Sequence, residues 1–95
     1  MKHYLAFDLG ASSGRAILGS IDQGKVTLKE LHRFENGGIA INGGLFWNFL
    51  GLFNELKIGL KKAIDSGVEL AGIAVDTWGV DYALIDKNGF FAGMP

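Results

Sequence analysis

The sequence predicts an α/β domain built on one mixed sheet, because strand and helix signals follow one another in a definite order. Three strand-like stretches come first, and their connections are too short for crossovers, which predicts antiparallel neighbours. One amphipathic stretch then predicts a helix, and a continuous apolar run of strand length follows it. The expected order is β-β-β-α-β-(β-β), in which the last two strands carry weaker signals.

The first two predicted strands cover residues 3–8 and 14–20, and a turn of small residues joins them. A third strand is expected over residues 25–34, where side chains alternate with a period of about two. Between Phe34 and Phe46 the chain is rich in Asn and Gly, and we expect an irregular loop there.

Apolar residues recur at three- and four-residue steps from Phe46 to Ile64, which predicts a helix with one buried face. Asn48 is the expected N-cap, and Gly67 is the expected left-handed C-cap. Glycine weakens a helix by about 1 kcal/mol relative to alanine, so glycines 51 and 59 are expected to allow close packing on the sheet. The aromatic residues expected in the core are Phe46, Trp47, Phe49 and Phe53.

The apolar run over residues 70–76 fits a strand that is buried on both faces and parallel to an earlier strand. Residues 80–85 and 90–92 are predicted as further strands around an Asn-Gly hairpin turn at 86–89. Three antiparallel strands, a helix and a returning parallel strand describe the core of the ribonuclease H-like fold.

Composition excludes several classes of function. The 95 residues make at most one small domain, and the net charge of −1 gives no field that would attract nucleic acid or an anionic membrane. Cysteine is absent, which excludes disulfides and thiolate metal sites, and His3 and His32 lack zinc-ligand spacing. No apolar run fits a signal peptide or a membrane span, so we expect a cytoplasmic protein.

The most informative stretch is Asp8–Arg15, where a carboxylate at a strand end is followed by small residues and a cation. This arrangement can hold a metal, cradle phosphate oxygens with backbone amides and neutralise their charge. Alternatively, Asp8 caps its own turn and Arg15 is a solvated strand residue. The small residues favour the phosphate site, because a plain hairpin turn would not need so many. The stretch matches neither a Walker A loop nor Gly-x-Gly-x-x-Gly.

A second constellation, Asp76–Asp81, places two carboxylates around a Trp-Gly break at a predicted strand end. Ligands often bind at the carboxyl ends of parallel strands. Gly79 would let a substrate approach the backbone, and Trp78 offers an apolar face that suits the C–H side of a sugar. The alternative is a turn with a core tryptophan and solvated aspartates.

Together, Asp8–Arg15 and Asp76–Asp81 resemble the FGGY family of carbohydrate kinases, which belongs to the superfamily of actin, sugar kinases and Hsp70. His32-Arg33-Phe34 and Trp47-Asn48 are also similar to that family. Ala11 stands where the wider superfamily usually has Thr, and in this respect the chain is similar to the rhamnulokinase subset.

The resemblance implies transfer of the γ-phosphoryl group of ATP, with Mg²⁺, to the 1-hydroxyl of the sugar L-rhamnulose. It implies that Asp8 holds Mg²⁺ through water. It implies that the ATP phosphates bind Ala11, Ser12, Ser13, Gly14 and Arg15, and that Gly79 contacts the sugar. The further candidate sugar-binding residues in that segment are Asp76, Trp78 and Asp81.

The family's catalytic base lies far downstream of these residues, so no catalytic residue is expected within 1–95. We expect residues 1–95 to be the N-terminal part of a first kinase lobe, inactive alone. Its expected partners are the remainder of its own kinase chain or a second copy of itself. The alternatives are another ketose kinase such as an L-fuculokinase, an actin-like or Hsp70-like ATPase domain, or a non-enzymatic phosphate-binding domain.

Overall fold

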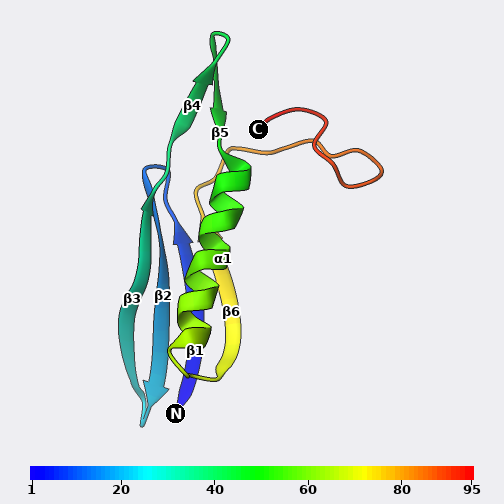
Figure 1. Ribbon diagram of the computed structural model, residues 1–95. Helices are drawn as coiled ribbons and strands as arrows, with labels where there is room; N and C mark the ends of the chain where they lie inside the picture. The colour runs from blue at the N-terminus through cyan, green and yellow to red at the C-terminus, as the bar shows by residue number, and fades with distance from the viewer.

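The computed structural model describes residues 1–95 as a four-stranded sheet, one helix and a separate two-stranded hairpin (Figure 1). The elements are β1 (Lys2–Leu9), β2 (Ser13–Asp22), β3 (Lys25–Glu35), β4 (Gly38–Ile41), β5 (Gly44–Trp47), α1 (Phe49–Asp65) and β6 (Leu70–Thr77). The predicted α/β class and the mixed sheet are therefore confirmed. No helix has the length and apolar character needed to cross a membrane.

The sheet has the order β3-β2-β1-β6, so the first strand lies inside it. β1 pairs antiparallel with β2 and parallel with β6, and β2 pairs antiparallel with β3. Short turns join the antiparallel strands, whereas the connection to the parallel strand runs through α1. The predicted meander and the returning parallel strand are both confirmed.

The core lies between the sheet and α1. Alternate residues of the two central strands point to the helix, and the buried apolar residues are Leu5, Phe7, Leu9, Ala16, Leu18 and Ala63. Gly59 is buried on the helix face, where an added Cβ would lie 2.8 Å from the Cβ of Ala16. Gly59 therefore allows α1 to approach the sheet closely, as expected. Gly51 does not, because a Cβ there would meet the side chain of Asn48 instead.

Both predicted helix caps are present. The side-chain Oδ1 of Asn48 accepts a hydrogen bond from the backbone N–H of Gly51 at 3.0 Å. At the other end Ser66 is the C-cap residue that follows α1, and Gly67 comes next with φ of +84°. The N–H of Gly67 donates to the carbonyl of Ile64 at 3.1 Å, so the left-handed glycine ends the helix.

A polar group joins β3 to α1 beside the apolar core. His32 Nε2 lies 2.5 Å from Glu55 Oε2, and Lys62 Nζ lies 3.0 Å from His32 Nδ1. Because an ammonium group can only donate, Nδ1 is the acceptor, and Nε2–H donates to the carboxylate. The His32 side chain is 14% exposed, so this strand histidine has a structural role.

The expected irregular loop before the helix is wrong, because β4 and β5 form an antiparallel hairpin there. Asn42 and Gly43 have φ of +48° and +79°, as a two-residue hairpin turn requires. The hairpin projects beyond the end of the main sheet (Figure 1).

The expectation that β6 is buried on both faces is also wrong. Ile73 and Val75 pair with Leu5 and Phe7 and so share the helix-facing side, yet each is 54% exposed. The physical reason is that α1 packs on β1, β2 and β3, while β6 has only β1 as a neighbour.

The two strands predicted near the C-terminus do not form. Only one antiparallel bridge, between Ile85 and Phe91, closes the turn at 86–89. The turn itself is confirmed, since the N–H of Gly89 donates to the carbonyl of Asp86 at 3.0 Å. No neighbouring strand is present to pair with this segment, and a lone two-stranded ladder is only marginally stable.

The aromatic residues at the start of the helix are less buried than expected. Phe49 is 44% exposed and Phe53 is 55% exposed, whereas Phe46 and Trp47 are half-buried. Phe49 packs edge-on against Phe91, with ring centroids 4.9 Å apart. The prediction that Phe49 and Phe53 lie in the core is therefore wrong, since about half of each side chain is exposed.

Candidate functional site

Asp8 lies near the carboxyl end of β1, directly between Arg15 on β2 and Asp76 on β6. Arg33 on β3 is in turn the partner of Arg15. Directly paired residues point to the same face of a sheet. A row of four charged side chains therefore crosses the sheet on the face opposite α1, because Asp8 alternates with the helix-facing Phe7.

Arg15 and Asp8 form a loose ion pair. The Nε of Arg15 lies 3.6 Å from Oδ2 of Asp8, which is too long for a hydrogen bond. This Nε is buried and has no hydrogen-bond acceptor. Buried donors are normally paired, so this Nε is an exception that only the loose contact with Asp8 offsets.

The turn between β1 and β2 is tight. The N–H of Gly10 donates to the carbonyl of Ser13 at 2.9 Å, and a Cβ on Gly10 would lie 2.8 Å from that oxygen. A Cβ on Gly14 would lie 2.3 Å from the ring of Phe34. Close packing therefore requires glycine at both positions, whether or not a ligand binds.

The tip of this turn offers free backbone donors. Ala11 and Ser12 are exposed, and neither donates any of the backbone hydrogen bonds found outside the helix and strands. Consecutive amides without an internal acceptor are the feature that anion-binding turns share. The turn can therefore bind an anion next to the Asp8–Arg15 pair.

The structure divides the segment Asp76–Asp81 into two parts. Asp76 belongs to the row of charges beside Asp8, whereas Trp78 and Asp81 lie beyond the strand end. The indole Nε1 of Trp78 donates to Oδ2 of Asp81 at 2.6 Å. Gly79 is exposed, and an added Cβ there would meet nothing within 4 Å.

Trp47, which the sequence predicted as a core residue, instead packs against Trp78 beyond the end of β6. Its ring centroid lies 4.4 Å from that of Trp78, with an angle of 38° between the planes. Both tryptophans line a largely apolar hollow, together with Phe49, Leu52, Asp81 and Tyr82. Trp47 is the last residue of β5 and lies just before α1, and the sequence signal for its role is the similarity of Trp47-Asn48 to the carbohydrate kinases.

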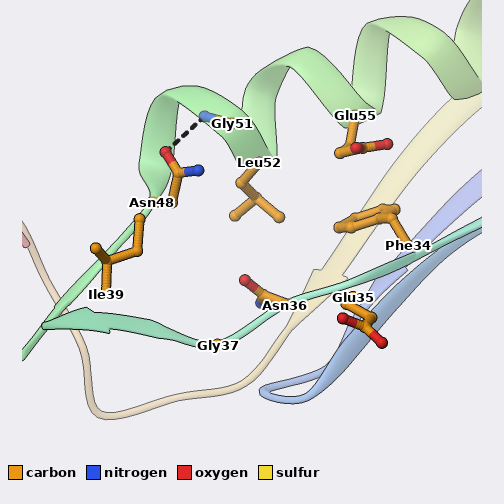
Figure 2. Close-up of a pocket in the computed structure, with 9 residues that line it drawn as sticks. All are labelled: Phe34, Glu35, Asn36, Gly37, Ile39, Asn48, Gly51, Leu52 and Glu55. Atoms are coloured by element: carbon orange, nitrogen blue, oxygen red, sulfur yellow. Dashed lines mark hydrogen bonds between the residues drawn. The ribbon is translucent and has the colours of Figure 1, made fainter.

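A second groove lies between the first turns of α1 and the segment that leads from β3 to β4 (Figure 2). Its lining includes the polar side chains of Glu35, Asn36, Asn48 and Glu55 and the apolar side chains of Phe34, Ile39 and Leu52. Asn36 also contacts the β1–β2 turn, because its Nδ2 donates to the carbonyl of Gly10 at 2.9 Å.

The charged row has the donor set that magnesium prefers. No group of three or more His, Cys, Asp or Glu side chains is close enough to hold a metal by itself. Mg²⁺ usually keeps several waters and binds one or two carboxylates together with phosphate oxygens. Asp8, whose side chain is 48% exposed, and its neighbour Asp76 fit that pattern.

Three known proteins that are similar to this chain are all rhamnulokinases. The chain is 47% identical over 88 residues to a rhamnulokinase of Halalkalibacterium halodurans, a match that covers 93% of this chain and 19% of that protein. It is 43% identical over 97 residues to a rhamnulokinase of Klebsiella pneumoniae, with 100% of this chain and 20% of that protein covered. The rhamnulokinase of Ligilactobacillus salivarius is 46% identical over 89 residues, which cover 94% of this chain and 18% of that protein.

No family model matches the chain. The chain spans about a fifth of the length of the curated relatives that it matches. The chain is thus related to sugar kinases and resembles the rhamnulokinases along its entire length.

Proposed function

We propose that this chain forms the phosphate-binding part of an ATP-dependent carbohydrate kinase of the rhamnulokinase type. The observation that carries the proposal is the position of Asp8 between Arg15 and Asp76, next to the free amides of Ala11 and Ser12. The sheet order, with β6 parallel to β1, supports a ribonuclease H-like first lobe for this kinase.

The turn and its flanking cation would hold the phosphates of ATP. The residues Ala11, Ser12, Ser13 and Gly14 contribute backbone amides and hydroxyl groups at the turn. Arg15 contributes positive charge through its guanidinium group, and its side chain is 33% exposed. These groups neutralise and align the phosphate chain, which is most of what phosphoryl transfer asks of a protein.

Asp8 would hold Mg²⁺ through water, with Asp76 as the neighbouring carboxylate. A bound Mg²⁺ would supply positive charge that offsets the negative charge of the phosphates during transfer. Asp8 on β1 and Arg15 on β2 are direct partners. The phosphates would therefore have positive charge on both sides, from the ion at Asp8 and from the guanidinium of Arg15.

The sugar would bind in the hollow beyond the end of β6, beside Trp78 and Asp81. Trp78 and Trp47 supply aromatic faces for the C–H side of a sugar, and Gly79 leaves open space for close approach to the backbone. Asp81 holds the Trp78 indole through its hydrogen bond, and Asp76, two residues before Trp78, is the direct partner of Asp8. We propose L-rhamnulose as the sugar and its 1-hydroxyl as the acceptor of the phosphoryl group.

A segment exchange tests the proposal in a working enzyme. Residues 1–95 replace the matching segment of the Halalkalibacterium halodurans rhamnulokinase, and L-rhamnulose-dependent ADP formation is measured. We expect the chimera to be active, with L-rhamnulose preferred to L-fuculose. A chimera that folds, as judged by circular dichroism and its thermal midpoint, but forms no ADP would contradict the proposal.

The isolated chain provides the complementary test. It would supply charge neutralisation and alignment but no base for the attacking hydroxyl, so we expect it to form no ADP with L-rhamnulose and MgATP. Turnover by the isolated chain would show that the base lies within these residues and would overturn this division of roles.

A further inference from the structure

Asn36 contacts the phosphate-binding turn from a distant part of the chain. Its side-chain Nδ2 donates to the carbonyl oxygen of Gly10 at 2.9 Å, and its backbone N–H donates to the carbonyl oxygen of Ser12 at 3.1 Å. Figure 2 shows Asn36 just past the end of β3, between α1 and the blue β1–β2 connection. One residue therefore holds two carbonyl groups of the turn.

These two bonds also fix the direction of two amides. In a planar trans peptide, the carbonyl and the N–H of the next residue point in opposite directions. Because the Gly10 carbonyl points toward Asn36, the N–H of Ala11 points away from it. The Ser12 carbonyl has the same effect on the N–H of Ser13.

The support behind Asn36 is well anchored. Two residues earlier, the ring of Phe34 lies against Gly14 of β2 and stacks on His32, with ring centroids 5.7 Å apart. His32 is joined to Glu55 and Lys62 of α1. The end of β3 is thus fixed by contacts with both the sheet and the helix, and so the position of Asn36 relative to the turn is fixed as well.

We propose that Asn36 is a positioning residue for phosphate binding. It turns the N–H groups of Ala11 and Ser13 toward the ligand and keeps the carbonyls of Gly10 and Ser12 away from it. A carbonyl oxygen that faced an anion would repel it, so the orientation matters as much as the number of donors. The inference rests on the proposed phosphate-binding role of the turn.

The test is a titration of the isotope-labelled chain with magnesium tripolyphosphate, followed by the backbone amide signals of Ala11 and Ser13. The variant is Asn36→Ala, and the matched control is Asn54→Ala, an exposed helix residue whose side chain makes no hydrogen bond. We expect Asn36→Ala to raise the dissociation constant about three- to tenfold, the effect of one lost hydrogen bond. Asn54→Ala leaves the dissociation constant unchanged.

A second measurement needs no substitution and so holds even where Asn36→Ala fails to fold. In the unaltered chain, a scalar coupling across the hydrogen bond between Asn36 Nδ2 and the Gly10 carbonyl should be detectable, and its absence overturns the inference. Equal dissociation constants for Asn36→Ala and Asn54→Ala also overturn it, while leaving phosphate binding intact. Tripolyphosphate that leaves the Ala11 and Ser13 signals of the unaltered chain unmoved overturns phosphate binding and the positioning role together.

Discussion

Asp8 and Asp76 are direct partners across the parallel strands β1 and β6, so two carboxylates lie side by side near the end of the sheet. Like charges in directly opposed positions destabilise a sheet. Arg15 offsets this on one side of Asp8 only, through a loose contact of 3.6 Å. The arrangement is costly in the free chain and suits a bound cation.

This cost predicts that Asp76→Asn stabilises the chain in the absence of ligands. Removing one carboxylate of the pair should raise the free energy of unfolding by about 0.2–1 kcal/mol. Chemical denaturation in metal-free buffer measures it. The control is Glu69→Gln, an exposed carboxylate in no ion pair; an equal gain in both variants would mean that net charge, rather than the pair, is responsible.

Asp8→Ala in the segment-exchange chimera should lower kcat by roughly 100-fold or more, the scale found when an electrostatic contact to the transition state is removed. The loss should reduce kcat and kcat/KM together, because the contact acts on charge that develops during transfer. Steady-state kinetics at saturating Mg²⁺ checks the prediction. Asp22→Ala, at the far end of β2, is the control, and unchanged turnover by Asp8→Ala would remove this carboxylate from the mechanism.

Gly79→Val should raise the KM for L-rhamnulose in the chimera and leave the KM for ATP nearly unchanged. An added Cβ at Gly79 meets no atom of residues 1–95 within 4 Å, so the substitution causes no clash in this part of the chimera, and its thermal midpoint shows whether folding is preserved. Gly93→Val is the matched control, because a Cβ at that position also meets nothing within 4 Å. Equal increases in both KM values would contradict a sugar role for Gly79.

His32→Ala should destabilise the chain by about 1–3 kcal/mol, because it leaves the Glu55 carboxylate without its donor. Thermal or chemical unfolding of the variant measures the loss. Arg33→Ala removes a neighbouring strand residue whose ion pair with Glu30 is exposed, and such pairs contribute about 1 kcal/mol at most. A smaller loss for His32→Ala than for Arg33→Ala would show that the contact with α1 does not support the fold.

Much of the fold could be predicted from local patterns. The β1–β2–β3 meander, the α1 boundaries and the Asn48 cap follow from periodicity and capping chemistry, which depend on residues close in sequence. The β4–β5 hairpin could not, because its strands have only four residues each and glycine begins both of them. The Asn42-Gly43 turn was the one available signal for it.

The candidate site was predictable to a smaller extent. Asp8, Arg15 and Asp76 could be recognised as charged residues near predicted strand ends, whereas their direct pairing is seen only in the structure. Trp47 and Asn36 carry no such local signal, since each reaches the site through a tertiary contact. The exposure of Ile73 depends on where α1 lies over the sheet, which no local pattern encodes.

The uncovered position of β6 has a consequence for how the chain folds. The meander closes through short turns, whereas β6 pairs with β1 only after the chain has passed through the hairpin and the helix. Loop closure of that length costs entropy, and the exposed Ile73 and Val75 gain little burial in return. We therefore expect β6 to dock last during folding and to open first, so that its amides exchange with deuterium sooner than those of β2.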